Sequence, residues 1–414
     1  MSERALRPWA FSFGAVIIAM MAIQMSSLGF SPLLPAIQKD FHLSYSQIGL
    51  FTGLYGLVAM AMSVPAGILA KRIGEKRALA GGLLGVALGL FLLSQASTYG
   101  SALGARIVWL LGYRVAFVCV MIAIALVSPG EFRSTAMGIL GAMASLASVI
   151  GAPFGTTIGG PLGWRGGIVG FAIMALLGAC VFWLGYSPGT GGAESATHSH
   201  SPAAHSSSAH SPATPTASAF RSPVVWSMVL LGLINMGGFS ATFFVPSAVK
   251  TTFQLGAMES AYVISASYVV AIFANLLFGY LCDRFDRWDM MIALALLLVP
   301  ACFAMMAPNL LVFRVATALV ISLGLCATNQ IFALAGDIVE RTEVGPVMGV
   351  VSLGGGLFGY VGPQVLGILR DRTGGFTAGW YFVAAGVLVS LIEIVFLRRY
   401  ARTRPVLALS ASRN

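Results

Sequence analysis

Three arginines, Arg106, Arg114 and Arg314, interrupt long apolar runs of this 414-residue chain. A charge is costly inside such a run, so each marks a candidate functional position. Arg114 follows Arg106 by eight positions, about 12 Å along a helix, and lies near the middle of its run. The carboxylate that lies within a run is Glu393, and it stands near the end of the run 378–397. Because a guanidinium presents a planar fork of donors, Arg114 predicts a site for an oxyanion such as a carboxylate or nitrate.

A structural role is the alternative for each of these arginines. Arg114 could bond to backbone carbonyls or reach toward one edge of the membrane. For Arg106 and Arg314, which stand near the starts of their runs, a structural hydrogen-bonding role is at least as well supported. Arg114 is therefore the arginine from which we predict an anionic ligand.

Amide and hydroxyl side chains lie at depth in several other runs. The candidates that could orient a bound solute are Gln24, Tyr55, Asn235, Tyr268, Asn329 and Gln330. For each single amide the alternative is a hydrogen bond between neighbouring helices. The runs hold no HExxH pattern, no Ser/His/Asp set and no paired acids. We therefore expect that the spans carry no catalytic residues, metal ligands or cofactor, and that the protein is not an enzyme.

The composition shows which elements must position these residues. Hydrophobic residues make up 57% of the chain and charged residues 9%, against about 25% charged in a soluble domain. So little charge excludes a soluble globule, a disordered chain and a nucleic-acid-binding domain. A multi-pass membrane protein embedded in a lipid bilayer remains, and the net charge of +10 then reports topology.

Twelve apolar runs are long enough to span a bilayer. They lie near 9–30, 46–70, 78–98, 101–127, 136–160, 166–186, 223–247, 259–282, 289–307, 310–335, 346–368 and 378–397. Each span must satisfy its own backbone hydrogen bonds in lipid, which favours helices. The predicted fold class is an all-α membrane protein with twelve transmembrane helices.

The basic residues predict the orientation of these spans. With twelve spans both termini lie on one side, and most Lys and Arg residues fall in the loops of that side. The opposite loops hold Lys39, Arg165, Lys250, Arg370 and Arg372. Since basic residues are retained in the cytoplasm, both termini are predicted to be cytoplasmic, in a cell (inner) membrane.

A polar segment rich in Ser, Ala, Pro and His separates spans six and seven. It predicts three parts: a six-helix bundle over 1–186, a flexible cytoplasmic linker over 187–222, and a second bundle with a basic tail over 223–414. Four of the five histidines lie in this linker, namely His198, His200, His205 and His210. They raise a divalent-metal exporter as an alternative function, although plain linkers have the same composition.

The two predicted halves repeat each other at an offset of about 210 positions. Gly67-Ile-Leu-Ala-Lys71-Arg72 follows span two and Gly279-Tyr-Leu-Cys-Asp283-Arg284 follows span eight. Pro35 and Phe41 likewise recur as Pro246 and Phe253, and Arg106 recurs as Arg314. Two parallel six-helix repeats predict a solute site near the middle of the membrane.

At these residues the sequence resembles the major facilitator superfamily of secondary transporters. That family carries Gly-x-x-x-Asp-Arg-x-Gly-x-Arg/Lys-Arg/Lys after its second helix, which corresponds here to residues 67–77, with Lys71 in place of the Asp. The resemblance implies two pseudo-symmetric six-helix bundles and alternating access. It also implies gating by the motif residues Gly67, Lys71, Arg72, Arg106, Gly279, Asp283, Arg284 and Arg314. Because Lys71 cannot accept the hydrogen bonds of that Asp, the latch of the first half is in question, whereas Asp283 keeps the acceptor.

The resemblance also bears on the solute and its coupling. Many proton-driven drug exporters of the family carry an acid in the first span, where this chain has Gln24. A drug efflux carrier is therefore the less favoured alternative. We expect a transporter, acting as a monomer, that moves a small anionic solute, with protons as the coupling ion of a symporter.

Overall fold

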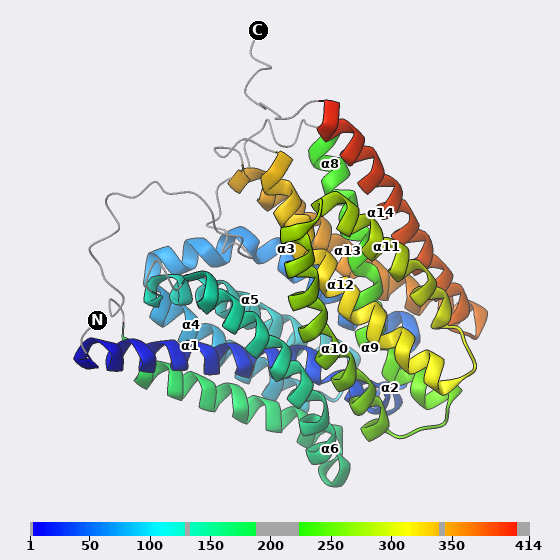
Figure 1. The fold of residues 1–414 in the computed structure, drawn as a ribbon. Coiled ribbons are helices and arrows are strands. Elements are labelled where there is room, and N and C mark those ends of the chain that lie inside the picture. Colours follow the sequence, from blue (N-terminus) through cyan, green and yellow to red (C-terminus); the bar gives the residue numbers. More distant parts are fainter. Residues whose placement is uncertain (1–2, 129–132, 188–222, 339–343, 404–414) are drawn as a thin grey trace. The chain divides into compact units, whose positions relative to one another are not determined.

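The computed structural model describes residues 3–128, 133–187, 223–338 and 344–403, and every regular element in these ranges is a helix (Figure 1). The elements before residue 188 are α1 (Glu3–Gly29), η1 (Ser31–Leu33), α2 (Leu34–Asp40), α3 (Tyr45–Ile73), α4 (Glu75–Ser94), α5 (Tyr99–Val127) and α6 (Arg133–Gly185). Those after residue 222 are α8 (Pro223–Leu230), η4 (Leu231–Ile234), α9 (Asn235–Thr252), α10 (Ala257–Arg284), α11 (Arg287–Ala304), α12 (Leu310–Ile338), α13 (Val344–Thr373) and α14 (Thr377–Thr403).

The helices of the described ranges account for the twelve predicted spans. Eleven of them are long and apolar enough to cross a membrane, and α6 counts among these as one helix of 53 residues. Within α6, Gly163 has a φ of 71°, which is not helical, so the element consists of two helices joined at this glycine. They match the runs predicted near 136–160 and 166–186, and the predicted fold class is confirmed.

The chain divides into two compact units. The first unit comprises Met1–Phe30 with Met62–Ala209, and the second comprises Ser31–Ala61 with His210–Asn414. Helix α3 begins in the second unit and ends in the first. The predicted linker lies almost wholly outside the described residues, so the boundaries predicted at 187 and 222 stay predictions.

Glycines bring the helices of the first unit close together. Helix α1 lies along α6, and α4 packs against α5 and α6 (Figure 1). A Cβ atom added to Gly89 of α4 would collide with the backbone of Trp109 on α5, and one on Gly29 would lie 2.6 Å from the backbone of Gly151. Small residues allow this approach, which replaces the hydrophobic effect as a source of helix association in lipid.

The second unit packs in the same way around α12. Helix α10 and α11 contact α12, α9 contacts α12 and α13, and α14 contacts α11. Glycines of α13 lie against neighbouring backbones: Gly354 against Val229 of α8, and Gly356 near Gly56 of α3. These contacts explain the glycine run of α13 as a packing surface.

Local signals in the sequence determine where two helices begin. At the start of α3, the Ser44 Oγ accepts from the Gln47 backbone N–H and the Gln47 side chain accepts from the Ser44 N–H. Thr98 and Ser101 make the same reciprocal pair at the start of α5. Each pair satisfies two backbone donors that the first helical turn leaves free.

Candidate functional site

Arg106 is enclosed between two aromatic rings of the first unit. Its side chain is fully buried, and the guanidinium carbon lies 4.4 Å from the ring centre of Phe30 and 4.0 Å from that of Trp109. The two rings meet edge to face at 5.1 Å. The guanidinium therefore lies in the corner that the two rings form, where its cation–π contact with Phe30, the residue after α1, stabilises the packing of this segment against α5.

Arg314, the repeat-related arginine, lies in a different environment. Its side chain is 42% exposed, and one guanidinium nitrogen lies 3.2 Å from Oε2 of Glu259, which is 45% exposed at the start of α10. An ion pair this exposed contributes about 0–1 kcal/mol. Arg314 therefore links the starts of α10 and α12 at the surface of the second unit, and its gating role stays a prediction.

Arg114 is half-buried on α5, one residue after a hydrogen-bonded tyrosine. The hydroxyl of Tyr113 donates to Oε1 of Gln24 on α1 at 2.5 Å. The Arg114 guanidinium carbon lies 5.8 Å from the ring centre of Phe117. The hydrogen bond from Tyr113 thus joins the predicted residue Gln24 of α1 to the helix that carries Arg114.

In the second unit, Asn235 is paired across helices. This buried residue at the start of α9 accepts a hydrogen bond from the hydroxyl of Thr328 on α12. Thr328 directly precedes the two predicted amides of α12 and was not predicted, because threonine is common in such helices. Gln330 is half-buried, and the side chain of Asn329 lies outside the described part of the chain.

Two predicted tyrosines occupy the same unit. The buried Tyr268 of α10 has its hydroxyl 3.4 Å from Oγ1 of Thr242 on α9. The ring of Tyr55 on α3 lies 5.4 Å from that of Phe239 on α9. Helix α9 therefore carries Asn235, Phe239 and Thr242, which contact polar or aromatic partners on three other helices.

The predicted gating residues surround the ends of α3 and α10. Gly67 is buried, whereas Lys71 and Arg72 are exposed in the last turn of α3. Gly74, with a φ of 83°, separates α3 from α4. Just beyond this turn Glu75 accepts a hydrogen bond from the Tyr186 hydroxyl at 3.3 Å, and burial, followed by the charge of Glu75, raises the pKa of Tyr186.

In the repeat-related loop of the second unit, Asp286 stands at the position of the second glycine of the motif Gly-x-x-x-Asp-Arg-x-Gly. Its carboxylate accepts from the Trp288 backbone N–H at 3.1 Å, which caps α11, and lies 3.4 Å from a guanidinium nitrogen of Arg398. Arg398 also pairs with Asp289 at 2.6 Å. The three predicted gating residues of this loop have different surroundings. The guanidinium carbon of Arg284 lies 4.7 Å from the ring centre of Tyr280, and Gly279 is half-buried. The side chain of Asp283 is outside the described part of the chain.

A carboxylate of α13 caps the start of α3. Asp371 accepts from the backbone N–H groups of Tyr45 at 2.8 Å and Ser46 at 2.7 Å. Beside it, the Arg370 guanidinium lies 4.8 Å from the ring of Tyr45 and 4.9 Å from that of Phe376. A negative charge at a helix N-terminus is favourable. Local patterning could not reveal this contact, because more than 300 residues separate its partners.

We expect Asp371→Ala to loosen the first turn of α3. Losing a cap costs about 1–2 kcal/mol, so the amides of Tyr45 and Ser46 should exchange hydrogen about 5- to 30-fold faster. Hydrogen–deuterium exchange of the peptide covering 45–52 measures this. The matched control is Asp286→Ala, which removes the cap of α11 and should change the peptide covering 287–294 instead. Unchanged exchange at 45–52 in Asp371→Ala would contradict the capping role.

The metal alternative concerns residues that the structure does not describe. His198, His200, His205 and His210 all lie within 188–222. Among the described residues no group of three or more His, Cys, Asp or Glu side chains is placed to hold a metal ion.

Comparison with known proteins adds a family to this geometry. The model of the Major Facilitator Superfamily matches residues 13–329 and 246–413. A protein of Agrobacterium vitis named for tartrate transport is 24% identical over 405 residues, which cover 90% of this chain and 86% of the relative. A protein of Staphylococcus epidermidis named for nitrate transport is 20% identical over 381 residues, covering 89% and 91%.

A solved structure agrees with the fold. A crystal structure of a bacterial homologue of the human lysosomal transporter Spinster has a TM-score of 0.76 at 17% identity, covering 97% of this chain and 98% of that one. At this identity the similarity establishes the architecture of the helices.

Proposed function

Since the chain belongs to the Major Facilitator Superfamily and is a multi-pass membrane transporter, we propose that its solute is a small anion, moved by alternating access. The observation that carries this proposal is Arg114, a half-buried cation in the middle of the spanning helix α5. A charge at this depth is rarely kept without a function. Two relatives named for tartrate and nitrate, both oxyanions, support the same sign of solute.

Each unit offers polar groups for such a solute. In the first unit Arg114 attracts the anion, while the hydrogen bond from Tyr113 to Gln24 holds two further polar groups on adjoining helices. The second unit, taken by itself, has the Asn235–Thr328 and Tyr268–Thr242 pairs, and with Tyr55, Asn329 and Gln330 these are the groups from which we propose hydrogen bonds to a solute. Because hydroxyls and amides both donate and accept, these pairs can exchange partners when solute binds.

The proposal includes a proton as the coupling ion, both termini in the cytoplasm and a cell inner membrane. The bias of Lys and Arg toward one set of loops supports this orientation. We propose further that the protein acts as a monomer, as each unit provides its own set of polar groups.

Uptake by purified protein in liposomes tests the solute class. Labelled tartrate or nitrate should enter protein-containing liposomes faster than protein-free ones, and an inward proton gradient should raise the rate. Parallel assays offer a cationic dye and Zn²⁺, the solutes of the two alternatives. Transport of either cation without transport of any small oxyanion would overturn the proposal.

We expect Lys71→Asp to shift the conformational balance of the transporter. The substitution restores the hydrogen-bond acceptor of the family motif in the loop of residues 67–77, which should favour the outward-open state. A cysteine replacing Tyr55 reports the shift as faster labelling by an impermeant thiol reagent added outside. Lys71→Met is the matched control, because it removes the positive charge without adding a carboxylate or amide oxygen as acceptor. Equal labelling rates in the two variants would show that this loop is no latch.

A further inference from the structure

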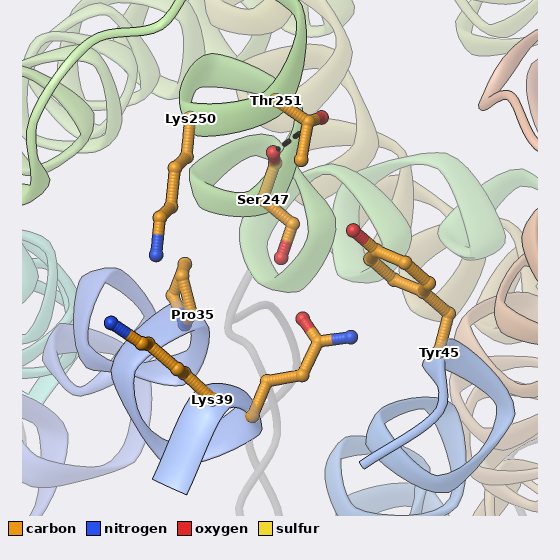
Figure 2. A pocket seen from close by; sticks show the side chains of 7 residues that line it. Pro35, Lys39, Tyr45, Ser247, Lys250 and Thr251 are labelled. Carbon is orange, nitrogen blue, oxygen red and sulfur yellow. Dashed lines mark hydrogen bonds between the residues drawn. The ribbon is translucent and has the colours of Figure 1, made fainter. Parts of the chain in front are cut away.

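A small cavity lies on the second unit, where α2, the start of α3 and the end of α9 meet. Its volume is about 160 Å³, and Figure 2 shows the side chains that line it. They are Pro35, Gln38, Lys39, Tyr45, Ser247, Lys250 and Thr251. This cavity holds none of the residues from which we propose solute binding.

Its two lysines are related by the internal repeat. Lys39 follows Pro35 by four positions, and Lys250 follows Pro246 by four. Residues four apart lie on the same face of a helix, so each repeat presents its lysine on the face of its proline. Figure 2 shows Lys39 and Lys250, which both line the cavity together with Pro35. The fold thus brings together two equivalent cations, one from each repeat.

Both cations lack a protein counter-ion. Lys39 and Lys250 are exposed, and among the described residues neither forms an ion pair. The carboxylate next to the lining residue Tyr45 is Asp371, which already accepts two backbone N–H groups. Two ammonium groups in one place repel each other, and a bound anion relieves this repulsion.

A buried hydroxyl completes the donor set. Ser247 is 2% exposed, and its Oγ has no hydrogen-bond partner among the residues that the structure describes. Figure 2 shows this hydroxyl pointing into the cavity. The neighbouring Thr251 hydroxyl is already used, since it donates to the Ser247 carbonyl at 2.9 Å. A buried donor without a partner is costly, so Ser247 favours an acceptor inside the cavity.

We propose that this cavity binds a small oxyanion between Lys39 and Lys250, with a third hydrogen bond from Ser247. The ligand class is a carboxylate or a nitrate-like ion, because its oxygens can accept from three donors at once. The inference rests on the proposed function, of which it is a second anion site: Lys39 and Lys250 stand at the ends of spans one and seven.

Thiol labelling tests the site without measuring transport. Thr251→Cys places a reporter on the rim in protein that also carries Cys180→Ala, since Cys180 is the exposed native cysteine. The anionic reagent sulfonatoethyl methanethiosulfonate should react about tenfold faster with this protein than with its Lys39→Gln/Lys250→Gln variant, since two cations attract it. The neutral reagent methyl methanethiosulfonate should react equally fast with both proteins. Millimolar tartrate or nitrate should slow the reaction of this neutral reagent with the protein that keeps Lys39 and Lys250, but not with the Gln variant.

Two further variants separate the possible failures. Lys39→Arg/Lys250→Arg keeps both charges and should keep the protection by anions. Arg114→Gln should also keep it, even though it disables the proposed transport site. If neither tartrate nor nitrate protects the reporter, or if the Gln variant is protected as well, the cavity is not an oxyanion site. That outcome leaves the role of Arg114 to be judged from transport alone.

Discussion

Replacing Arg114 with Gln is expected to lower uptake of the anionic solute by about 30-fold or more, while the protein still folds and inserts. Removing one partner of a desolvated charge pair costs about 2–5 kcal/mol, and each 1.4 kcal/mol is a factor of about ten. Gln keeps a polar side chain of similar size, so the loss reports the missing charge. The measurement is the initial rate of uptake in liposomes, normalised to the amount of inserted protein.

Two companion variants show whether the effect belongs to Arg114. Arg372→Gln removes an exposed arginine at the end of α13 that is neither a predicted binding residue nor a predicted gating residue, so its rate should stay within about fivefold of the unmodified protein. Arg114→Lys keeps the charge but loses the planar fork, and should retain an intermediate rate. Near-normal uptake by Arg114→Gln, or equal losses in Arg114→Gln and Arg372→Gln, would rule out the assignment of the anion site to Arg114.

Replacing Arg106 with Ala is expected to destabilise the first unit more than any exposed substitution. The fully buried guanidinium lies between the rings of Phe30 and Trp109, so its removal leaves a void and ends both cation–π contacts. A loss of about 2–4 kcal/mol is expected, which lowers the unfolding temperature by about 5–10 °C. A thiol-reactive dye measures the unfolding temperature, because the buried Cys119 on α5 becomes reactive when the unit opens.

The control for Arg106 is an exposed arginine. Arg372→Ala removes a charge at the end of α13 and should leave the unfolding temperature unchanged. Arg106→Met fills much of the volume without a charge and should recover part of the stability, which separates packing from the cation–π contribution. An unfolding temperature of Arg106→Ala equal to that of Arg372→Ala would contradict the structural role of Arg106.

The contrast between Arg106 and Arg314 shows where prediction from sequence ended. The internal repeat relates the two, and one role was therefore expected for both. In the structure Arg106 is fully buried against Phe30 and Trp109, whereas Arg314 forms an exposed ion pair with Glu259. The repeat preserves the position on the helix, but Phe30 and Glu259, the contacts outside each arginine's own helix, come from other parts of the chain.

The polar pairs of the candidate site give the same lesson. Gln24 and Asn235 were predicted from their depth in apolar runs, but their hydrogen bonds to Tyr113 and Thr328 were not. A side chain at a given depth can face a neighbouring helix, lipid or solute. The apolar sequence around it does not distinguish these three orientations. The partner depends on how the helices rotate and pack.

The amino-acid sequence by itself determined the spanning helices, the repeat and the central position of Arg114. Lipid offers no hydrogen bonds to the backbone, so each span must be a long apolar helix that local composition reveals. Only the tertiary structure decided that Arg106 is held between two rings, that Asp371 caps α3, and that Lys39 and Lys250 share one cavity. Apart from the contact of Arg106 with Trp109 on its own helix, these contacts join residues tens to hundreds of positions apart, and helix packing, which no local pattern records, brings them together.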